Sequence, residues 1–136
     1  MTTTVSLPIE IKKRELDGKL LLSLALANND YKVAVGQLGR IKNGVDIIRP
    51  NIYIACNALY SKMDRQLFEQ LSENRCTIAL LDTEGGIFSN IEDYRKRLSE
   101  KILPYVDIYF AWGEKTAKIF PQDEFLGTKI VISSNP

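Results

Sequence analysis

Carboxylates and cations gather at two places in the sequence, each directly after a run of apolar residues. Arg14 and Glu15 lie between the apolar run 5–11 and a long apolar helix, while Asp82 and Glu84 follow the apolar run 76–81. Charges placed between buried elements lose hydration, which is costly unless partners or a function stabilise them. In an open α/β sheet, the loops after the strands lie at the carboxyl edge, where ligands bind. These loops are therefore the first place to search for a site.

The first of these charged loops can combine a base with cations. A carboxylate at Glu15 would accept a proton from a hydroxyl group, while Lys12 and Arg14 would hold an anionic part of the substrate. The simpler interpretation is a carboxylate that stabilises the start of a helix beside a solvated arginine. Gly18 lies one turn inside that helix, where glycine costs about 1 kcal/mol relative to alanine. It either permits close packing of the helix or lets a substrate approach the helix N-terminus.

The second charged loop and an aromatic residue offer related chemistry. Asp82 or Glu84 would act as a base or accept hydrogen bonds from substrate hydroxyl groups, and partial burial would raise the pKa of either carboxyl. The alternative is an ordinary turn, because aspartate and the paired glycines that follow are turn formers. Trp112 ends a later apolar run. It belongs either to the core or to a site in which its ring stacks on a sugar.

Several classes of chemistry are excluded by what the sequence lacks. The 136 residues include no histidine, which removes Ser-His and Cys-His nucleophile pairs and nearly all zinc sites. The two cysteines, Cys56 and Cys76, lie in apolar runs, and we expect buried reduced thiols. Neither a G-x-G-x-x-G fingerprint nor a Walker loop occurs, so dinucleotide and P-loop nucleotide binding lose their main support. No cluster of metal ligands or cofactor motif is visible, so we expect neither a metal nor a cofactor.

Bulk properties favour an ordinary cytoplasmic protein. The net charge is +1, which does not indicate nucleic acid as a partner. No apolar run approaches the roughly 20 residues that span a bilayer, so we expect no transmembrane segment. The N-terminus lacks the basic start and apolar centre of a signal peptide.

Predicted strands and helices alternate along the chain. Their spacing predicts one domain, residues 1–136, with a Rossmann-like three-layer α/β/α fold and a mostly parallel sheet of about six strands. The apolar run 76–81 is typical of a parallel strand buried on both faces. Strands are expected at 5–11, 31–35, 52–56, 76–81, 106–112 and 129–133, and helices at 16–28, 38–42, 61–71, 89–102 and 114–120.

Two of the predicted helices carry explicit expectations about their faces. In the helix 16–28, leucines and alanines at three- and four-residue spacing, such as Leu20 and Leu24, predict the buried side. In the helix 89–102, we expect the basic run Arg95, Lys96, Arg97 and Lys101 to stay solvated.

Three segments together resemble a known family. Residues 7–22 (LPIEIKKRELDGKLLL), 82–85 (DTEG) and 110–113 (FAWG) are similar to the N-terminal half of bacterial surface carbohydrate (surface polysaccharide) biosynthesis proteins, which are GT-B glycosyltransferases. The resemblance implies a Rossmann-like domain that binds a sugar acceptor, followed by a second domain that binds a nucleotide-sugar donor. The positions that match the family are Arg14, Glu15, Asp17, Gly18, Asp82, Glu84, Gly85, Trp112 and Gly113.

The resemblance also implies roles and partners. By analogy with GT-B enzymes, Glu15 is the first candidate and Glu84 the second for the base that deprotonates the acceptor. The family pattern continues into a donor domain after residue 136, so we expect this chain to be inactive alone and to need a partner domain or a second copy. The alternative is a non-catalytic α/β module that binds a small anionic sugar or nucleotide. A receiver-like regulatory domain is disfavoured, because Asn57 stands where a receiver needs an aspartate.

Overall fold

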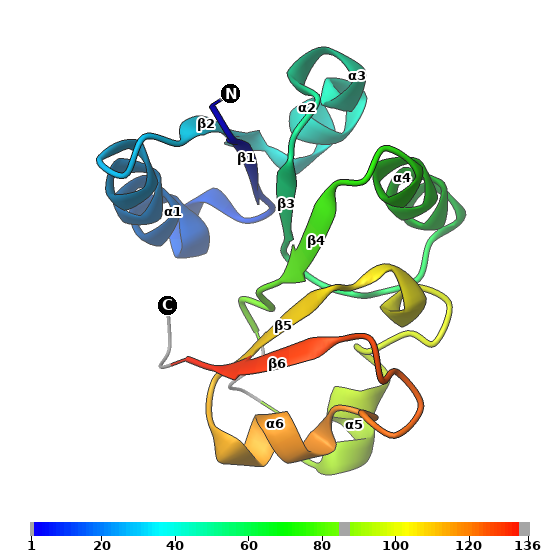
Figure 1. Cartoon of the computed structure of the whole chain (residues 1–136). Coiled ribbons are helices and arrows are strands. Elements are labelled where there is room, and N and C mark those ends of the chain that lie inside the picture. The colour runs from blue at the N-terminus through cyan, green and yellow to red at the C-terminus, as the bar shows by residue number, and fades with distance from the viewer. Residues whose placement is uncertain (1, 85–87, 134–136) are drawn as a thin grey trace.

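Six strands run parallel in one sheet, in the order β2-β1-β3-β4-β5-β6 (Figure 1). The computed structural model describes residues 2–84 and 88–133. The predicted three-layer, Rossmann-like α/β fold is confirmed. The strands are β1 (Thr4–Ile9), β2 (Lys32–Gln37), β3 (Ile52–Ala55), β4 (Thr77–Leu80), β5 (Ile108–Ala111) and β6 (Lys129–Ile132).

Helices cover the two faces of the sheet unequally. One face carries α1 (Lys12–Ala27), whose Leu22 and Leu26 pack on a cluster from β1, β3 and β4. The larger cluster, on the other face, lies under all the remaining helices. Right-handed crossovers explain this, because the chain moves outward from β1 to β2 and then reverses to build β3 to β6. The remaining helices are α2 (Leu38–Asn43), α3 (Val45–Ile48), α4 (Lys62–Glu73), α5 (Ile91–Arg95), the 3-10 helix η1 (Leu103–Tyr105) and α6 (Glu114–Ile119).

The strand order reverses at β1. Because β1 lies between β2 and β3, the loops after β1 and β3 leave the sheet toward opposite faces at its carboxyl edge. Open α/β sheets commonly bind ligands at the carboxyl edge where the strand order reverses. Side chains from the two loops meet there, since the Asn57 amide donates to Glu10 Oε2 at 3.1 Å. The β1–β3 ladder ends early, at Ser6 paired with Tyr53.

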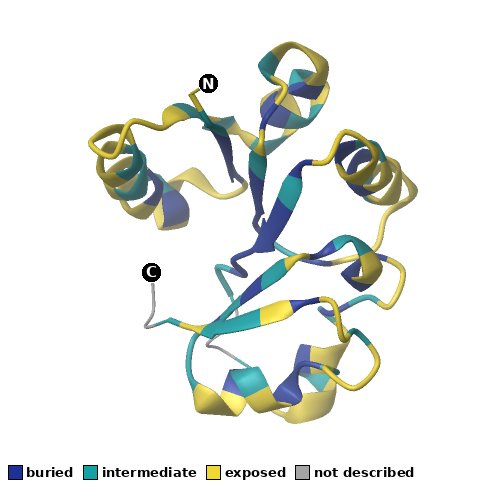
Figure 2. Ribbon diagram, in the orientation of Figure 1, coloured by how far each residue is buried: buried dark blue, intermediate teal, exposed yellow. Residues whose placement is uncertain are grey.

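The predicted buried side of α1 is wrong. Leu20 and Leu24 are 42% and 63% exposed, whereas Glu15 and Lys19 are buried. Figure 2 shows exposed positions along much of α1. An apolar pattern that runs around most of a helix does not specify which side faces the sheet. The polar contacts of Glu15, described below, fix the rotation instead. The Lys19 amine is also buried and has no hydrogen-bond partner among the described residues.

The predicted helix 89–102 is shorter than expected. Asn90 caps α5, with its side chain accepting from the Asp93 N–H, but α5 ends at Arg95. Turns follow, and the Ser99 N–H donates to the carbonyl of Ala58 rather than to a helical partner. This contact belongs to an isolated bridge between Ala58 and Leu98. The chain therefore leaves the helical path, and the residues after Arg95 point in directions that a helical wheel does not predict.

The unequal burial of leucines gives a direct stability test. Leu80→Ala removes a side chain that is fully buried in β4, and we expect it to lower the free energy of unfolding by about 2–5 kcal/mol. Leu24→Ala removes an exposed side chain of α1, and the expected change is within about 0.5 kcal/mol. Urea denaturation of both variants measures the difference. Equal losses would contradict the orientation of α1.

Candidate functional site at the carboxyl edge

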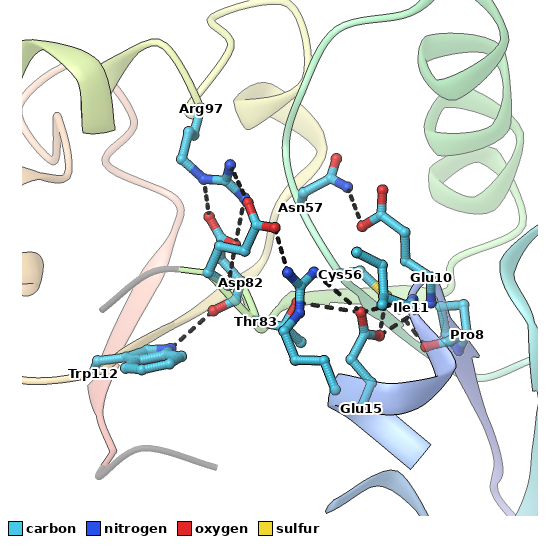
Figure 3. A network of polar contacts seen from close by, with 12 residues as sticks. Pro8, Glu10, Ile11, Glu15, Cys56, Asn57, Asp82, Thr83, Arg97 and Trp112 are labelled. Carbon is cyan, nitrogen blue, oxygen red and sulfur yellow. Dashed lines mark hydrogen bonds and ion pairs between the residues drawn. The ribbon is translucent and has the colours of Figure 1, made fainter. Parts of the chain in front are cut away.

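Five residues predicted from the sequence meet at the carboxyl edge of the sheet (Figure 3). They come from the first turn of α1, the loop after β4 and the segment after β5, and are connected through side-chain and backbone hydrogen bonds. Arg97, which follows α5, joins them. The predicted members of this network are Arg14, Glu15, Asp82, Glu84 and Trp112.

Glu15 is a buried carboxylate that fastens the start of α1. Its two oxygens accept the backbone N–H groups of Ile11 and Glu10, at 3.0 and 3.1 Å. The Thr83 hydroxyl lies 3.5 Å from Oε1, and the Cys56 thiol lies 3.7 Å from Oε2. The side chain thus reaches back over the first turn of its own helix and touches the loops after β3 and β4. The interpretation of Glu15 as a carboxylate at a helix start describes this geometry well, although the residue is far more buried than such carboxylates usually are.

Asp82 and Arg97 form a buried, two-point ion pair. The guanidinium donates from Nε to Oδ2 at 2.9 Å and from Nη2 to Oδ1 at 2.8 Å. Asp82 is 1% exposed, and Oδ1 also accepts the backbone N–H of Glu84 at 3.0 Å. Fork-to-fork pairs of this kind combine strength with fixed geometry. The pair therefore holds the loop after β4 against the turn that follows α5.

Glu84 lies between two arginines. Its Oε1 is 2.5 Å from Arg14 Nη1, and its Oε2 is 2.7 Å from Arg97 Nη1. The Arg14 guanidinium, with Arg97 beside it, holds the pKa of the Glu84 carboxyl below its usual range. A carboxylate with a lowered pKa is a weaker general base. In this arrangement the Glu84 carboxylate is the shared ion-pair partner of Arg14 and Arg97.

Trp112 connects the ion-pair network to a shallow hollow. Its indole N–H donates to the backbone carbonyl of Asp82 at 2.8 Å. The hollow has a volume of about 320 Å³ and is lined by Phe88, Trp112, Gly113, Lys115 and Thr116. The Lys115 amine lies 5.4 Å from the centre of the Phe88 ring, so an aromatic surface and a cation face the same space.

Four other predicted site residues that the structure describes lie outside the network. Lys12 and Asp17 are exposed and take part in none of its ion pairs within the described part of the chain. Gly18 is exposed as well, and a Cβ added there would meet nothing within 4 Å, which excludes close helix packing as its reason. Gly113 precedes α6, with its N–H donating to Thr116 Oγ1 at 3.1 Å. Gly85 lies outside the described residues.

Arg97 was missed because it was expected on a solvated helix face. The prediction for this residue is wrong, since its side chain is 21% exposed and contacts two carboxylates. A signal for it did exist in the sequence. Two carboxylates directly after a buried strand need a cation partner, and residues 95–97 are the next basic cluster along the chain. The spacing alone could not select Arg97 from its neighbours.

Cys56 and Cys76 are free and buried, as predicted. Burial raises the pKa of each thiol to about 12, so both stay protonated at neutral pH. The Cys56 thiol donates to the Pro8 carbonyl at 3.2 Å, which places it beside Glu15 as a structural donor. Within residues 2–84 and 88–133, no three histidine, cysteine, aspartate or glutamate side chains are grouped to hold a metal ion.

Comparison with known proteins gives no assignment. No family model matches the chain, and no curated protein matches it. The fold and the site therefore define an α/β domain of the Rossmann-like class with a charged and aromatic carboxyl edge.

Among the described helices, none has both the length and the apolar character required to cross a bilayer.

The buried ion pair makes a testable contribution to stability. Arg97→Ala leaves the Asp82 carboxylate buried without its main partner, and we expect a loss of about 3–5 kcal/mol in the free energy of unfolding. Arg95→Ala, two residues away, removes an exposed cation and should change stability by less than about 0.5 kcal/mol. Urea denaturation measures both, and similar values would refute the described pairing.

The lowered pKa of Glu84 predicts a specific pH dependence. Its folded-state pKa lies below the ordinary value of 4.5, so its ionised form stabilises the fold. That contribution is complete above this value and is lost as the pH falls through the folded-state pKa. Glu84→Gln should therefore be less stable than wild type at about pH 7, and the difference should shrink by about pH 3. A difference that is the same at both pH values in urea denaturation would contradict the ion pairs.

Proposed function

We propose that this chain is the acceptor-side domain of a GT-B glycosyltransferase of surface carbohydrate (polysaccharide) biosynthesis, acting in the cytoplasm. The observation that supports it best is the meeting of Arg14, Glu15, Asp82, Glu84 and Trp112 at one edge of the sheet. These residues belong to the three segments that resemble the family. The segments lie far apart in the sequence, so their convergence on one network is consistent with a shared site.

A sugar acceptor fits the aromatic hollow beside Trp112. Aromatic rings present an apolar face that matches the C–H face of a sugar, while their polar edges and neighbours supply hydrogen bonds. Trp112 and Phe88 provide the rings, Lys115 provides a cation, and the volume of about 320 Å³ lies at the lower end for small-molecule sites. We expect one sugar unit to occupy this hollow, with the rest of the acceptor along the rim toward Arg14.

The base in the complete enzyme would be Glu84 or Glu15. Glu84 is the more accessible, with 40% of its side chain exposed, but the arginines lower its pKa. Release of Glu84 from them would return the pKa toward its ordinary value and strengthen the carboxylate as a base. Before Glu15 could act as the base, the hydrogen bonds that it accepts from the backbone N–H groups of Glu10 and Ile11 would have to break.

A non-catalytic binding module is the second candidate. It is favoured by the fact that both candidate bases, Glu15 and Glu84, are occupied by hydrogen bonds and ion pairs. Such a module would bind a small anionic sugar or nucleotide at the same edge.

In the proposed glycosyltransferase, a second domain or a partner chain would hold the nucleotide-sugar donor, and sugar transfer would need both parts.

Saccharide binding to the isolated chain tests the proposal. Fragments of bacterial surface polysaccharides are titrated by calorimetry against wild type, Trp112→Ala and Trp112→Phe. Trp112→Ala should weaken binding at least about tenfold, because stacking on one ring contributes about 1–3 kcal/mol in comparable base–aromatic sites. Trp112→Phe should retain most of the affinity.

The control is Tyr31→Ala, which removes an aromatic side chain that is 36% exposed next to the opposite edge of the sheet. It should leave saccharide binding unchanged. A nucleotide sugar is titrated in parallel. Binding of the nucleotide sugar without any saccharide binding would overturn the proposal and favour the nucleotide-binding module instead.

A further inference from the structure

We propose that Arg14 and Arg97 form a binding site for a phosphoryl group, and that the Glu84 carboxylate occupies this site in the present structure. The inference names the substrate class of the site described above. The inference rests on the proposed function only in assigning the phosphoryl group to a sugar acceptor.

Each arginine contacts a second, buried carboxylate in addition to Glu84. Asp82, 1% exposed, accepts from Nε and Nη2 of Arg97. Glu15, 4% exposed, lies 3.5 Å from Nη2 of Arg14 and is itself fixed by backbone N–H groups. The two guanidinium groups thus have buried partners in different parts of the fold, Glu15 in the first turn of α1 and Asp82 in the loop after β4. Such second contacts preorganise a binding site, because the cations lose little further freedom when a ligand arrives.

The remaining Nη1 atoms of the two arginines converge on one exposed anion. Arg14 Nη1 contacts Oε1 of Glu84 and Arg97 Nη1 contacts Oε2, at 2.5 and 2.7 Å. A phosphoryl group offers two oxygens at a similar spacing, together with further oxygens and a larger charge. Arginine is well suited to planar, two-point recognition of both carboxylate and phosphate. The glutamate side chain therefore shows where and how a phosphoryl group would sit.

Only the side chain of Glu84 has to move for this exchange. Its backbone N–H donates to Asp82 Oδ1 at 3.0 Å, which holds the backbone of Glu84 itself while the carboxylate swings away. The side chain is 40% exposed, and exposed ion pairs are weak because water competes for both partners. A phosphoryl group can compete with such a pair. Displacement would also free the Glu84 carboxylate beside the bound ligand.

The rival explanation is an ion-pair network that only locks the loops together. The two explanations predict opposite effects for Glu84→Gln on anion binding. If Glu84 competes with a ligand, wild type binds only while the Glu84 carboxylate is away from the arginines. Removing the carboxylate then raises the affinity for the ligand by one divided by the fraction of time that the wild-type site is open. If the network is only structural, the same change loosens the site and raises no affinity.

Titration of the intact chain with inorganic phosphate, at constant ionic strength, tests the proposal. Glu84→Gln should bind phosphate about fivefold or more tightly than wild type, and Glu73→Gln, an exposed glutamate at the far end of α4, should not differ from wild type. Arg14→Ala should bind at least about tenfold more weakly, whereas the exposed Arg95→Ala should be unchanged. Because Arg97→Ala leaves Asp82 without its main partner, Arg97→Lys is used in its place, and the melting temperature of every variant is recorded.

Three results would overturn the proposal. The first is a Glu84→Gln affinity equal to or below that of wild type in a protein that remains folded. The second is an equal loss in Arg14→Ala and Arg95→Ala, which would indicate attraction to bulk charge. The third is tighter binding of glucuronate than of phosphate, which would assign the site to a sugar carboxylate. Since phosphate contains no sugar, its binding can succeed or fail independently of the saccharide titration.

Discussion

Two carboxylates buried at the carboxyl edge impose a constraint on everything around them. Glu15 and Asp82 are both buried, and burying a carboxylate is costly unless hydrogen-bond donors surround it. Glu15 takes the donors at the start of α1, which sets the rotation of that helix. Asp82 accepts two hydrogen bonds from the guanidinium of Arg97, which fixes the turn after α5 against the loop after β4. The site is therefore organised from the buried side outward, and Glu84 occupies the position nearest to solvent.

This organisation leaves neither candidate base, Glu15 or Glu84, without a hydrogen-bonding or ion-pair partner. The groups first considered as bases already have partners, and the pKa of the Glu84 carboxyl is lowered by the arginines. The aromatic hollow beside Trp112 offers a different kind of surface, suited to a ring rather than to a charge. A ligand that combined a sugar with an acidic group would use both surfaces at once. Catalysis would then require the carboxylate to be released first.

The sequence predicted the sheet, the alternation of elements and the convergence of five rim residues. Continuous apolar runs define buried parallel strands, and their carboxyl ends must share an edge. It could not predict the rotation of α1, because leucines lie around most of that helix and the decisive contact is polar. Arg97 was missed for a related reason. Its position depends on where α5 ends, which is set by the contact of Ala58 with the turn around Leu98 and Ser99.

The place of the first strand has a practical consequence for how the protein can be handled. Because β1 separates β2 from β3, it is the strand through which β2 joins the rest of the sheet, and trimming it would divide the sheet in two. Its first residue, Thr4, lies at the amino edge of the sheet, whereas Arg14 and Glu84 lie at the carboxyl edge. Figure 1 shows the N-terminal end at the other end of β1 from the start of α1. An affinity handle or surface tether attached before Thr4 would therefore leave the opposite rim open to ligands.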